Sequence, residues 1–247
     1  MGTVALQRYS VNIAQFRVKI FADGADKRSI LDLYKNPAIQ GFTTNPTLMR
    51  QVGISDYLAF AREILAEIPD RPFSLEVFSD DFPEMGRQAR KLAALAPNVY
   101  VKIPITNTRG EASAPLVREL TREGIQLNVT ALMTLEQVRT TAEALSGSPS
   151  AYISIFAGRV ADAGIDPLPI MIKALEIMSP QPQLELIWAS PREIFNLVQA
   201  HQIGCHIITI THDLLKKLPN LGKDLTEFSL DTVKMFHRDA QAAGFEL

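Results

Sequence analysis

The chain has 247 residues, of which 47% are hydrophobic and 21% charged, and this composition excludes a disordered or low-complexity protein. Its 25 lysines and arginines nearly balance 27 aspartates and glutamates, so no basic surface for nucleic acid is predicted. The single cysteine, Cys205, excludes a disulfide framework and a cysteine-rich zinc site. No apolar run approaches the roughly 18 residues of a membrane span, and residues 1–16 lack a signal-peptide pattern. We therefore expect a soluble, cytoplasmic protein that binds neither nucleic acid nor membrane.

Eight short apolar segments follow one another along the chain. Each has the length of a strand and is rich in Ile, Val, Phe or Leu, as expected for strands buried on both faces. We predict strands at 17–23, 38–44, 72–78, 98–105, 124–131, 151–157, 183–190 and 205–211.

The segments between these strands show helical spacing. Apolar residues at 57, 61, 64 and 65 follow the i, i+4, i+7, i+8 pattern of one helix face. The same spacing recurs within 85–93 and, in part, within 171–178, and the pair Asp166–Pro167 is a helix start signal. A last amphipathic helix is predicted at 225–243, where it could cover the barrel or a neighbouring subunit.

Alternating strands and helices predict parallel strands joined by crossovers. Eight such units fit a (β/α)8 TIM barrel, which takes roughly 250 residues, so we predict one α/β domain over 17–247 with an extra C-terminal helix. Residues 1–16 are predicted to be an N-terminal extension. A doubly wound open sheet is the alternative, although residues 21–28, FADGADKR, lack the GxGxxG loop such a sheet often carries.

Polar residues occur where a barrel places its chemistry, at the carboxyl ends of the strands. Each predicted strand from the first to the seventh carries at least one near that end. They are Asp23, Thr43, Thr44, Asn45, Glu76, Lys102, Asn128, Thr130, Ser154, Arg159, Ser190 and Arg192, with Phe156 on the same face as Ser154.

Each of these residues also has a structural interpretation. Asp23 could be a helix N-cap and Asn45 could form a turn before Pro46, while Asn128 and Thr130 could bond to backbone groups. The residues at 159, 190 and 192 could be solvated loop residues. The convergence of the whole set of polar residues on one end of a barrel favours a functional site instead. Glu76 in particular lies in an apolar strand, where a glutamate is rarely buried without a partner.

Lys102 is the most informative of these residues. It lies in an apolar strand, where a cation is costly unless it is paired or neutral, and burial that disfavours the charged form makes an amine nucleophilic near neutral pH. The alternative is a lysine whose stem is buried while its head reaches water. Lys19 also lies in an apolar strand, but four residues before Asp23, toward the opposite end of the barrel.

The chemistry that fits is Schiff-base formation. Lys102 would attack a ketone carbonyl, Asp23 would remove a hydroxyl proton to break the adjacent carbon–carbon bond, and Glu76 would move protons through a water. We predict no cofactor and no metal, because the four histidines lack a ligand pattern such as HExxH. Cys205 and His206 are adjacent in one strand and point to opposite faces, so we do not expect them to share a metal ion.

At these residues the sequence resembles the transaldolase family. The motifs that carry the resemblance are GFTTNPTL at 41–48, VYVKIPIT at 99–106, LNVTALMT at 127–134, SIFAGRVAD at 154–162 and WASPRE at 188–193. The resemblance covers about residues 17–247 and implies a class I aldolase barrel that acts on sugar phosphates.

The resemblance also implies roles for single residues. Lys102 would form the imine, Asp23 would be the acid/base, and Glu76 with Thr130 would hold a water that relays protons. Asn45, Asn128 and Ser154 would hold the dihydroxyacetone unit, and Arg159, Ser190 and Arg192 would bind phosphate. Phe156 would also line the substrate-binding site, and it bears on the type of reaction.

Glu76 and Phe156 match transaldolases, whereas the related fructose-6-phosphate aldolases carry Gln and Tyr there. A phenylalanine has no hydroxyl to protonate the enamine left after cleavage, so the three-carbon unit would wait for an acceptor. The resemblance thus implies transfer of a dihydroxyacetone unit from a ketose phosphate, such as fructose 6-phosphate or sedoheptulose 7-phosphate, to an aldose phosphate. An aldolase that releases dihydroxyacetone and a non-catalytic sugar-phosphate binding barrel are the alternatives.

The sequence departs from the family at two places, which bear on the choice of sugars. Gly24 follows Asp23 where the family usually has threonine, and His212 and Asp213 stand where it often has a Ser-Pro turn. We expect sugar phosphates as small-molecule partners and a homo-oligomer in solution.

Overall fold

A computed structural model describes residues 15–246. Eight parallel strands pair in the order β1 to β8 and close into a barrel, which confirms the predicted TIM barrel and excludes the open sheet. The strands are β1 Lys19–Asp23, β2 Ile39–Thr43, β3 Phe73–Glu76, β4 Val99–Pro104, β5 Leu127–Leu132, β6 Ala151–Ile155, β7 Leu184–Trp188 and β8 Ile207–Thr211.

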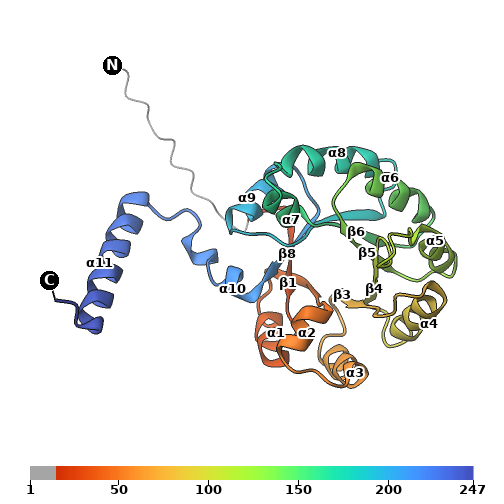
Figure 1. The fold of residues 1–247 in the computed structure, drawn as a ribbon, viewed down its shortest axis with the longest axis horizontal. Coiled ribbons are helices and arrows are strands. Elements are labelled where there is room, and N and C mark those ends of the chain that lie inside the picture. The colour runs from red at the N-terminus through yellow and green to blue at the C-terminus, as the bar shows by residue number, and fades with distance from the viewer. Residues whose placement is uncertain (1–14, 247) are drawn as a thin grey trace, which may run out of the picture.

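The helices lie around the strands (Figure 1). They are α1 Lys27–Tyr34, α2 Pro46–Gln51, α3 Tyr57–Glu67, α4 Phe82–Ala93, α5 Ala114–Arg122, α6 Leu135–Ala144, α7 Ala157–Asp162, α8 Leu168–Met178, α9 Phe195–Gln202, α10 His212–Leu215, the 3₁₀ turn η2 Leu218–Asn220, and α11 Leu225–Ala243. None of the described helices is both long and apolar enough to cross a membrane.

Several helices begin just after a strand, at a side chain that accepts a backbone N–H. Asp26 caps α1 and Asn45 caps α2, while Thr134 and Gln137 form a reciprocal capping box at α6. Such caps fix short strand-to-helix loops, and these loops form the carboxyl-end mouth of the barrel.

Aromatic side chains fill the barrel interior below this mouth. Tyr100 and Tyr152 stack with centroids 4.0 Å apart, and Phe21 meets Tyr152 edge-on at 5.8 Å. Gly41 makes room for this layer, because a Cβ atom there would lie 2.5 Å from the Phe21 ring. All three rings are buried, and the layer forms an apolar floor beneath the site.

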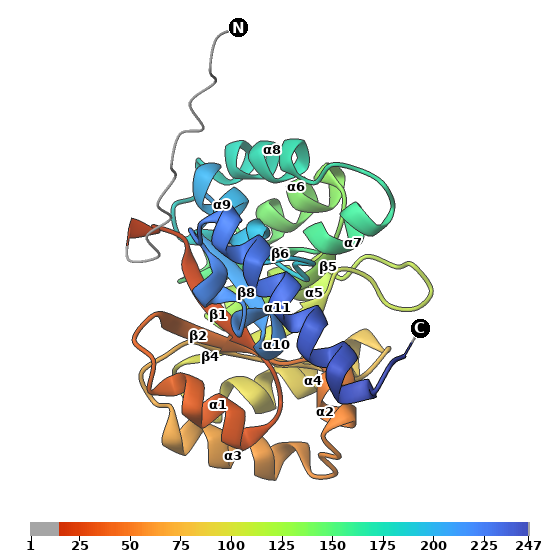
Figure 2. The ribbon, with the colours of Figure 1, turned by 90° about the vertical axis from the view of Figure 1, so that its left-hand side faces the viewer.

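Helix α11 stands apart from the barrel, beyond α10 (Figure 1), and lies in front of the barrel in the turned view (Figure 2). None of its residues is buried. Leu225, Val233 and Phe236 share one face and are 77%, 60% and 63% exposed. The predicted helix is therefore present, and it does not cover its own barrel.

Candidate functional site

A cavity of about 510 Å³ opens at the carboxyl ends of the strands. Every residue proposed from the sequence as catalytic or substrate-binding lines it, although they come from loops and strands spread over the chain. The lining includes Asp23, Asn45, Glu76, Lys102, Asn128, Thr130, Ser154, Phe156, Arg159, Ser190 and Arg192.

Lys102 is the buried cation of this cavity. Its side chain is only 8% exposed, and Nζ lies 3.0 Å from Oε2 of Glu76. The Nζ group also donates to the carbonyl oxygen of Thr44 at 2.9 Å. Strand register sets this contact, because Glu76 pairs with Lys102 and Lys102 with Asn128 across three neighbouring strands.

Lys19 provides the internal comparison. It begins β1, pairs with the carboxylate of Glu185 at 2.8 Å, and is 44% exposed. It does not line the cavity. The two lysines of the apolar strands therefore differ as their positions along the strands predict.

Asp23 ends β1 inside the cavity and does not cap α1, a role that belongs to Asp26. Thr43 donates its hydroxyl to Oδ1 of Asp23 at 2.7 Å, and the same hydroxyl lies 2.6 Å from that of Thr209. Burial raises the pKa of Asp23, while the Lys102 charge and the Thr43 hydrogen bond act against that rise. A carboxyl group with a raised pKa suits a proton donor and acceptor.

Thr130 presents an unsatisfied hydroxyl. Its Oγ1 is buried and has no hydrogen-bond partner among residues 15–246. Because buried polar atoms normally have partners, this atom is suited to bind a water or a substrate group in the cavity it lines.

Asn128 and Ser154 are tied into a buried chain. Ser154 donates to Oδ1 of Asn128 at 2.8 Å, and Nδ2 of Asn128 donates to the Ser74 hydroxyl at 3.0 Å. These bonds fix the Asn128 amide at the level of Lys102. Asn45 is fixed differently, since its Oδ1 accepts from the backbone N–H of Leu48 as the cap of α2.

The opposite side of the cavity is cationic. Arg159 lies in α7, with its guanidinium 5.9 Å from the ring centroid of Phe156. Ser190 and Arg192 lie in the loop after β7, and Ser190 has a φ angle of 59°. Arginine side chains match phosphate oxygens in geometry and charge.

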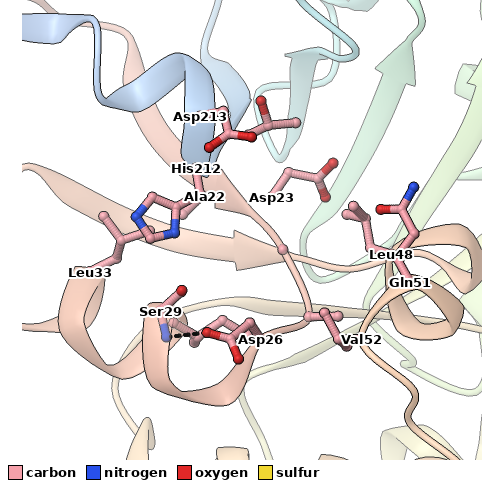
Figure 3. Close-up of a pocket in the computed structure, with 14 residues that line it drawn as sticks. Ala22, Asp23, Asp26, Ser29, Leu33, Leu48, Gln51, Val52, His212 and Asp213 are labelled. Carbon is pink, nitrogen blue, oxygen red and sulfur yellow. Dashed lines mark hydrogen bonds between the residues drawn. The ribbon is translucent and has the colours of Figure 1, made fainter. Parts of the chain in front are cut away.

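A second, smaller cavity of about 170 Å³ borders Asp23 and contains both family departures (Figure 3). Gly24, His212 and Asp213 line it. Nothing lies within 4 Å of the position of a Cβ at Gly24, so a side chain there would project into open space. Figure 3 shows Asp23 between His212 on one side and Leu48 with Gln51 on the other.

Within the described part of the chain, no group of three or more His, Cys, Asp or Glu side chains could hold a metal ion. Cys205 is buried and unpaired with another cysteine, and burial raises its pKa to about 12. The neighbouring His206 accepts a hydrogen bond at Nδ1 from the backbone N–H of Leu186. Neither side chain lines the main cavity.

Sequence reasoning did not assign a role to some residues of the site. Thr209 reaches the cavity from β8 and bonds Thr43; its alternation with Thr211 in an isoleucine-rich strand is a signal that could have found it. Tyr57, from α3, accepts the backbone N–H of Glu76 at 2.9 Å. Only the fold brings that side chain to β3.

Comparisons with known proteins show the family of the chain. A family model described as Transaldolase/Fructose-6-phosphate aldolase matches residues 20–247. The chain belongs to this family. It is 33% identical to a probable transaldolase of a Thermoanaerobacter species, over 93% of this chain and 100% of that protein.

Other members of the transaldolase/fructose-6-phosphate aldolase family are similarly related. A probable transaldolase of Dehalococcoides mccartyi is 35% identical over 81% of this chain and 90% of its own. Probable transaldolase 2 of Listeria monocytogenes is 38% identical over 81% and 88%. Among solved structures, 3-keto-L-gulonate-6-phosphate decarboxylase from Vibrio cholerae has a TM-score of 0.52 at 12% identity, covering 79% of this chain and 87% of its own. That likeness shows the barrel fold alone.

The raised pKa of Asp23 predicts that Asp23→Asn increases the melting temperature by several degrees at pH 7. A raised folded-state pKa means that the ionised carboxylate costs stability in the folded protein, fully so above that pKa. The gain should shrink as the pH falls through the folded pKa toward the unfolded one. Thermal unfolding between pH 3 and pH 8 would measure this.

Asp26→Asn is the matched control. Hydrogen bonds from Ser29 lower the pKa of Asp26, so its ionised form stabilises the fold at neutral pH and that stability is lost as the pH falls. Asp26→Asn should therefore not raise the melting temperature at pH 7. A lower melting temperature for Asp23→Asn at pH 7 would contradict the assignment.

Proposed function

We propose that the protein is a transaldolase that transfers a dihydroxyacetone unit from a ketose phosphate, such as fructose 6-phosphate or sedoheptulose 7-phosphate, to an aldose phosphate. The observation that carries the proposal is the buried amine of Lys102 held 3.0 Å from Glu76 in one cavity with Asp23. The relatives named probable transaldolase support it.

The reaction begins with the amine. Neutral Nζ of Lys102 attacks the ketone carbon of the donor, and the resulting carbinolamine loses water to give an iminium ion. Oε2 of Glu76 lies within hydrogen-bond distance of Nζ and can take the proton that the ammonium must lose before attack. A water held by the unpartnered Thr130 hydroxyl would carry protons to and from the departing oxygen.

Carbon–carbon bond cleavage then depends on Asp23. Its carboxylate takes the proton of the hydroxyl two carbons from the iminium carbon, and the bond between the intervening carbon and the hydroxyl-bearing carbon breaks. The electron pair of that bond moves into the iminium to form an enamine, and the aldose phosphate leaves as an aldehyde. Attack of the enamine on an acceptor aldehyde reverses these steps, with Asp23 returning the proton, and hydrolysis frees Lys102.

Substrate orientation follows from the two sides of the cavity. Asn45, Asn128 and Ser154 offer hydroxyl-binding groups near Lys102, whereas Arg159, Ser190 and Arg192 lie toward β6 and β7. We propose that the first group holds the dihydroxyacetone unit and the second holds the phosphate group.

The imine predicts a trapped adduct. Sodium borohydride added with fructose 6-phosphate should reduce the imine irreversibly and add the sugar-derived mass to the peptide that contains Lys102. Peptide mass mapping checks the position, and Lys102→Met should abolish the adduct, whereas Lys19→Met should leave it. An adduct on Lys19, or none with any ketose phosphate tested, would refute the proposal.

Transfer rather than release is supported by Phe156. Its ring lines the cavity and carries no hydroxyl that could protonate the enamine carbon. A fructose-6-phosphate aldolase that releases free dihydroxyacetone is the second candidate, since the matching family model names both activities.

Omission of the acceptor aldehyde separates the two candidates. We expect the cleavage of fructose 6-phosphate by the parent enzyme to stop after about one equivalent per site, because the enamine stays on Lys102. Phe156→Tyr should increase the steady release of dihydroxyacetone, measured by its reduction with a coupled dehydrogenase. Unchanged turnover of the parent without an acceptor would favour the aldolase.

We also propose that the protein is a homo-oligomer in which α11 packs on a neighbouring copy. The exposed apolar face of α11 supports this, since large exposed apolar surfaces mark interaction sites. Phe236→Glu should reduce the molar mass measured by light scattering to that of fewer copies, whereas Gln241→Glu, on the polar side, should not. A parent protein that is monomeric at all accessible concentrations would contradict the proposal.

A further inference from the structure

We propose that Asp162 is a positioning residue that holds the guanidinium of Arg192 for the phosphate group of the substrate. The inference deepens the proposed function, on which it rests, because it concerns the phosphate end of the same cavity. Asp162 ends α7, whereas Arg192 lies in the loop after β7, so only the fold brings the two side chains together.

The contact between them is a side-on fork. Nε of Arg192 donates to Oδ1 of Asp162 at 2.9 Å, and Nη2 donates to Oδ2. Two parallel bonds fix the plane of a guanidinium as well as its position. They leave Nη1, with both of its N–H groups, without a partner among the described residues, and Arg192 lines the cavity while Asp162 does not.

The backbone next to Arg192 is fixed independently. The N–H groups of Arg192 and Glu193 both donate to Oδ1 of Asn196, at 2.8 and 3.1 Å. On the other side, a Cβ at Gly158 would lie 1.6 Å from the carbonyl oxygen of Ser190, so only glycine permits this approach of α7 to the loop. These contacts fix the backbone but not the long side chain of Arg192. The side chain is held in place by Asp162.

Because Asp162 is negatively charged, the two possible roles of this residue predict opposite effects on phosphate binding. A carboxylate beside an anion site repels the anion, so a residue that only competed for Arg192 would weaken phosphate binding. A residue that orders Arg192 would strengthen binding, because a flexible arginine loses conformational freedom when it binds a ligand. The Arg192 hydrogen bonds lower the pKa of Asp162, so the fork is intact at neutral pH.

The test uses inorganic phosphate as the probe, titrated into the full-length protein and followed by 31P NMR or calorimetry. Arg192→Ala should weaken phosphate binding by about tenfold or more, as expected when a charge-assisted contact is lost. Asp162→Asn should weaken it by about threefold to tenfold, because the amide can accept from one N–H but opposes the other. In the Arg192→Ala background, Asp162→Asn should not weaken phosphate binding further, because Asp162 then has no arginine to position.

Glu123→Gln is a matched control. Glu123, just after α5, forms a similar side-on fork with Arg90 of α4, through Nε at 2.8 Å and Nη2 at 2.5 Å, although Nη2 also donates to Glu119. Both pairs are similarly exposed. Breaking the Arg90 fork should leave phosphate binding unchanged, which separates positioning from a general loss of surface ion pairs.

Kinetic constants separate a positioning role of Asp162 from a purely structural one, because a structural role would not raise KM for phosphorylated substrates alone. Asp162→Asn should raise KM for a phosphorylated ketose by the factor seen for phosphate, with kcat and the kinetics of an unphosphorylated ketose unchanged. Tighter or unchanged phosphate binding in Asp162→Asn, or equal weakening without Arg192, would overturn the inference. Absence of an imine on Lys102 in the parent would instead overturn the proposed function, and the phosphate titration would still decide the role of Asp162.

Discussion

The site depends on the alternation of side chains inside a closed barrel. Residues two apart on a strand point to the same side, so three groups of the mouth, Asp23, Lys102 and Ser154, each have a ring directly below them. Phe21 precedes Asp23, Tyr100 precedes Lys102, and Tyr152 precedes Ser154 by two positions. These buried rings give the polar layer an apolar floor, and a low dielectric constant strengthens electrostatic contacts. Glu76 is the ion-pair partner of Lys102 in this environment, and removing one member of a buried pair typically costs about 3–5 kcal/mol.

Much of the fold and of the candidate site follows from the sequence, because both depend on position along strands. The apolar segments locate all eight strands, although the fifth begins at Leu127 rather than 124. Once the strands are placed in a barrel, their carboxyl ends must converge. The same rule separates two lysines with nearly identical neighbours, since Lys102 faces the cavity and Lys19 pairs with Glu185 at a distance from it.

What the sequence does not supply are contacts between elements of different type. The pair Asn45–Pro46 is compatible with a simple turn, yet Asn45 caps a six-residue helix and lines the cavity as well. Asp162 lies within a family motif, but its meeting with Arg192 depends on the close approach of α7 to the loop after β7 at Gly158. Such contacts depend on helix placement and on backbone angles such as the φ of 59° at Ser190, which no local pattern encodes.

Helix α11 has a thermodynamic consequence. Because its residues bury nothing against their own barrel, its apolar face adds no stability to an isolated copy of the chain. Any free energy gained by covering that face must come from another molecule and therefore follows mass action. If a second copy of the chain covers the helix, as proposed, the apparent melting temperature rises with protein concentration, and a stability measured at one concentration describes that concentration alone.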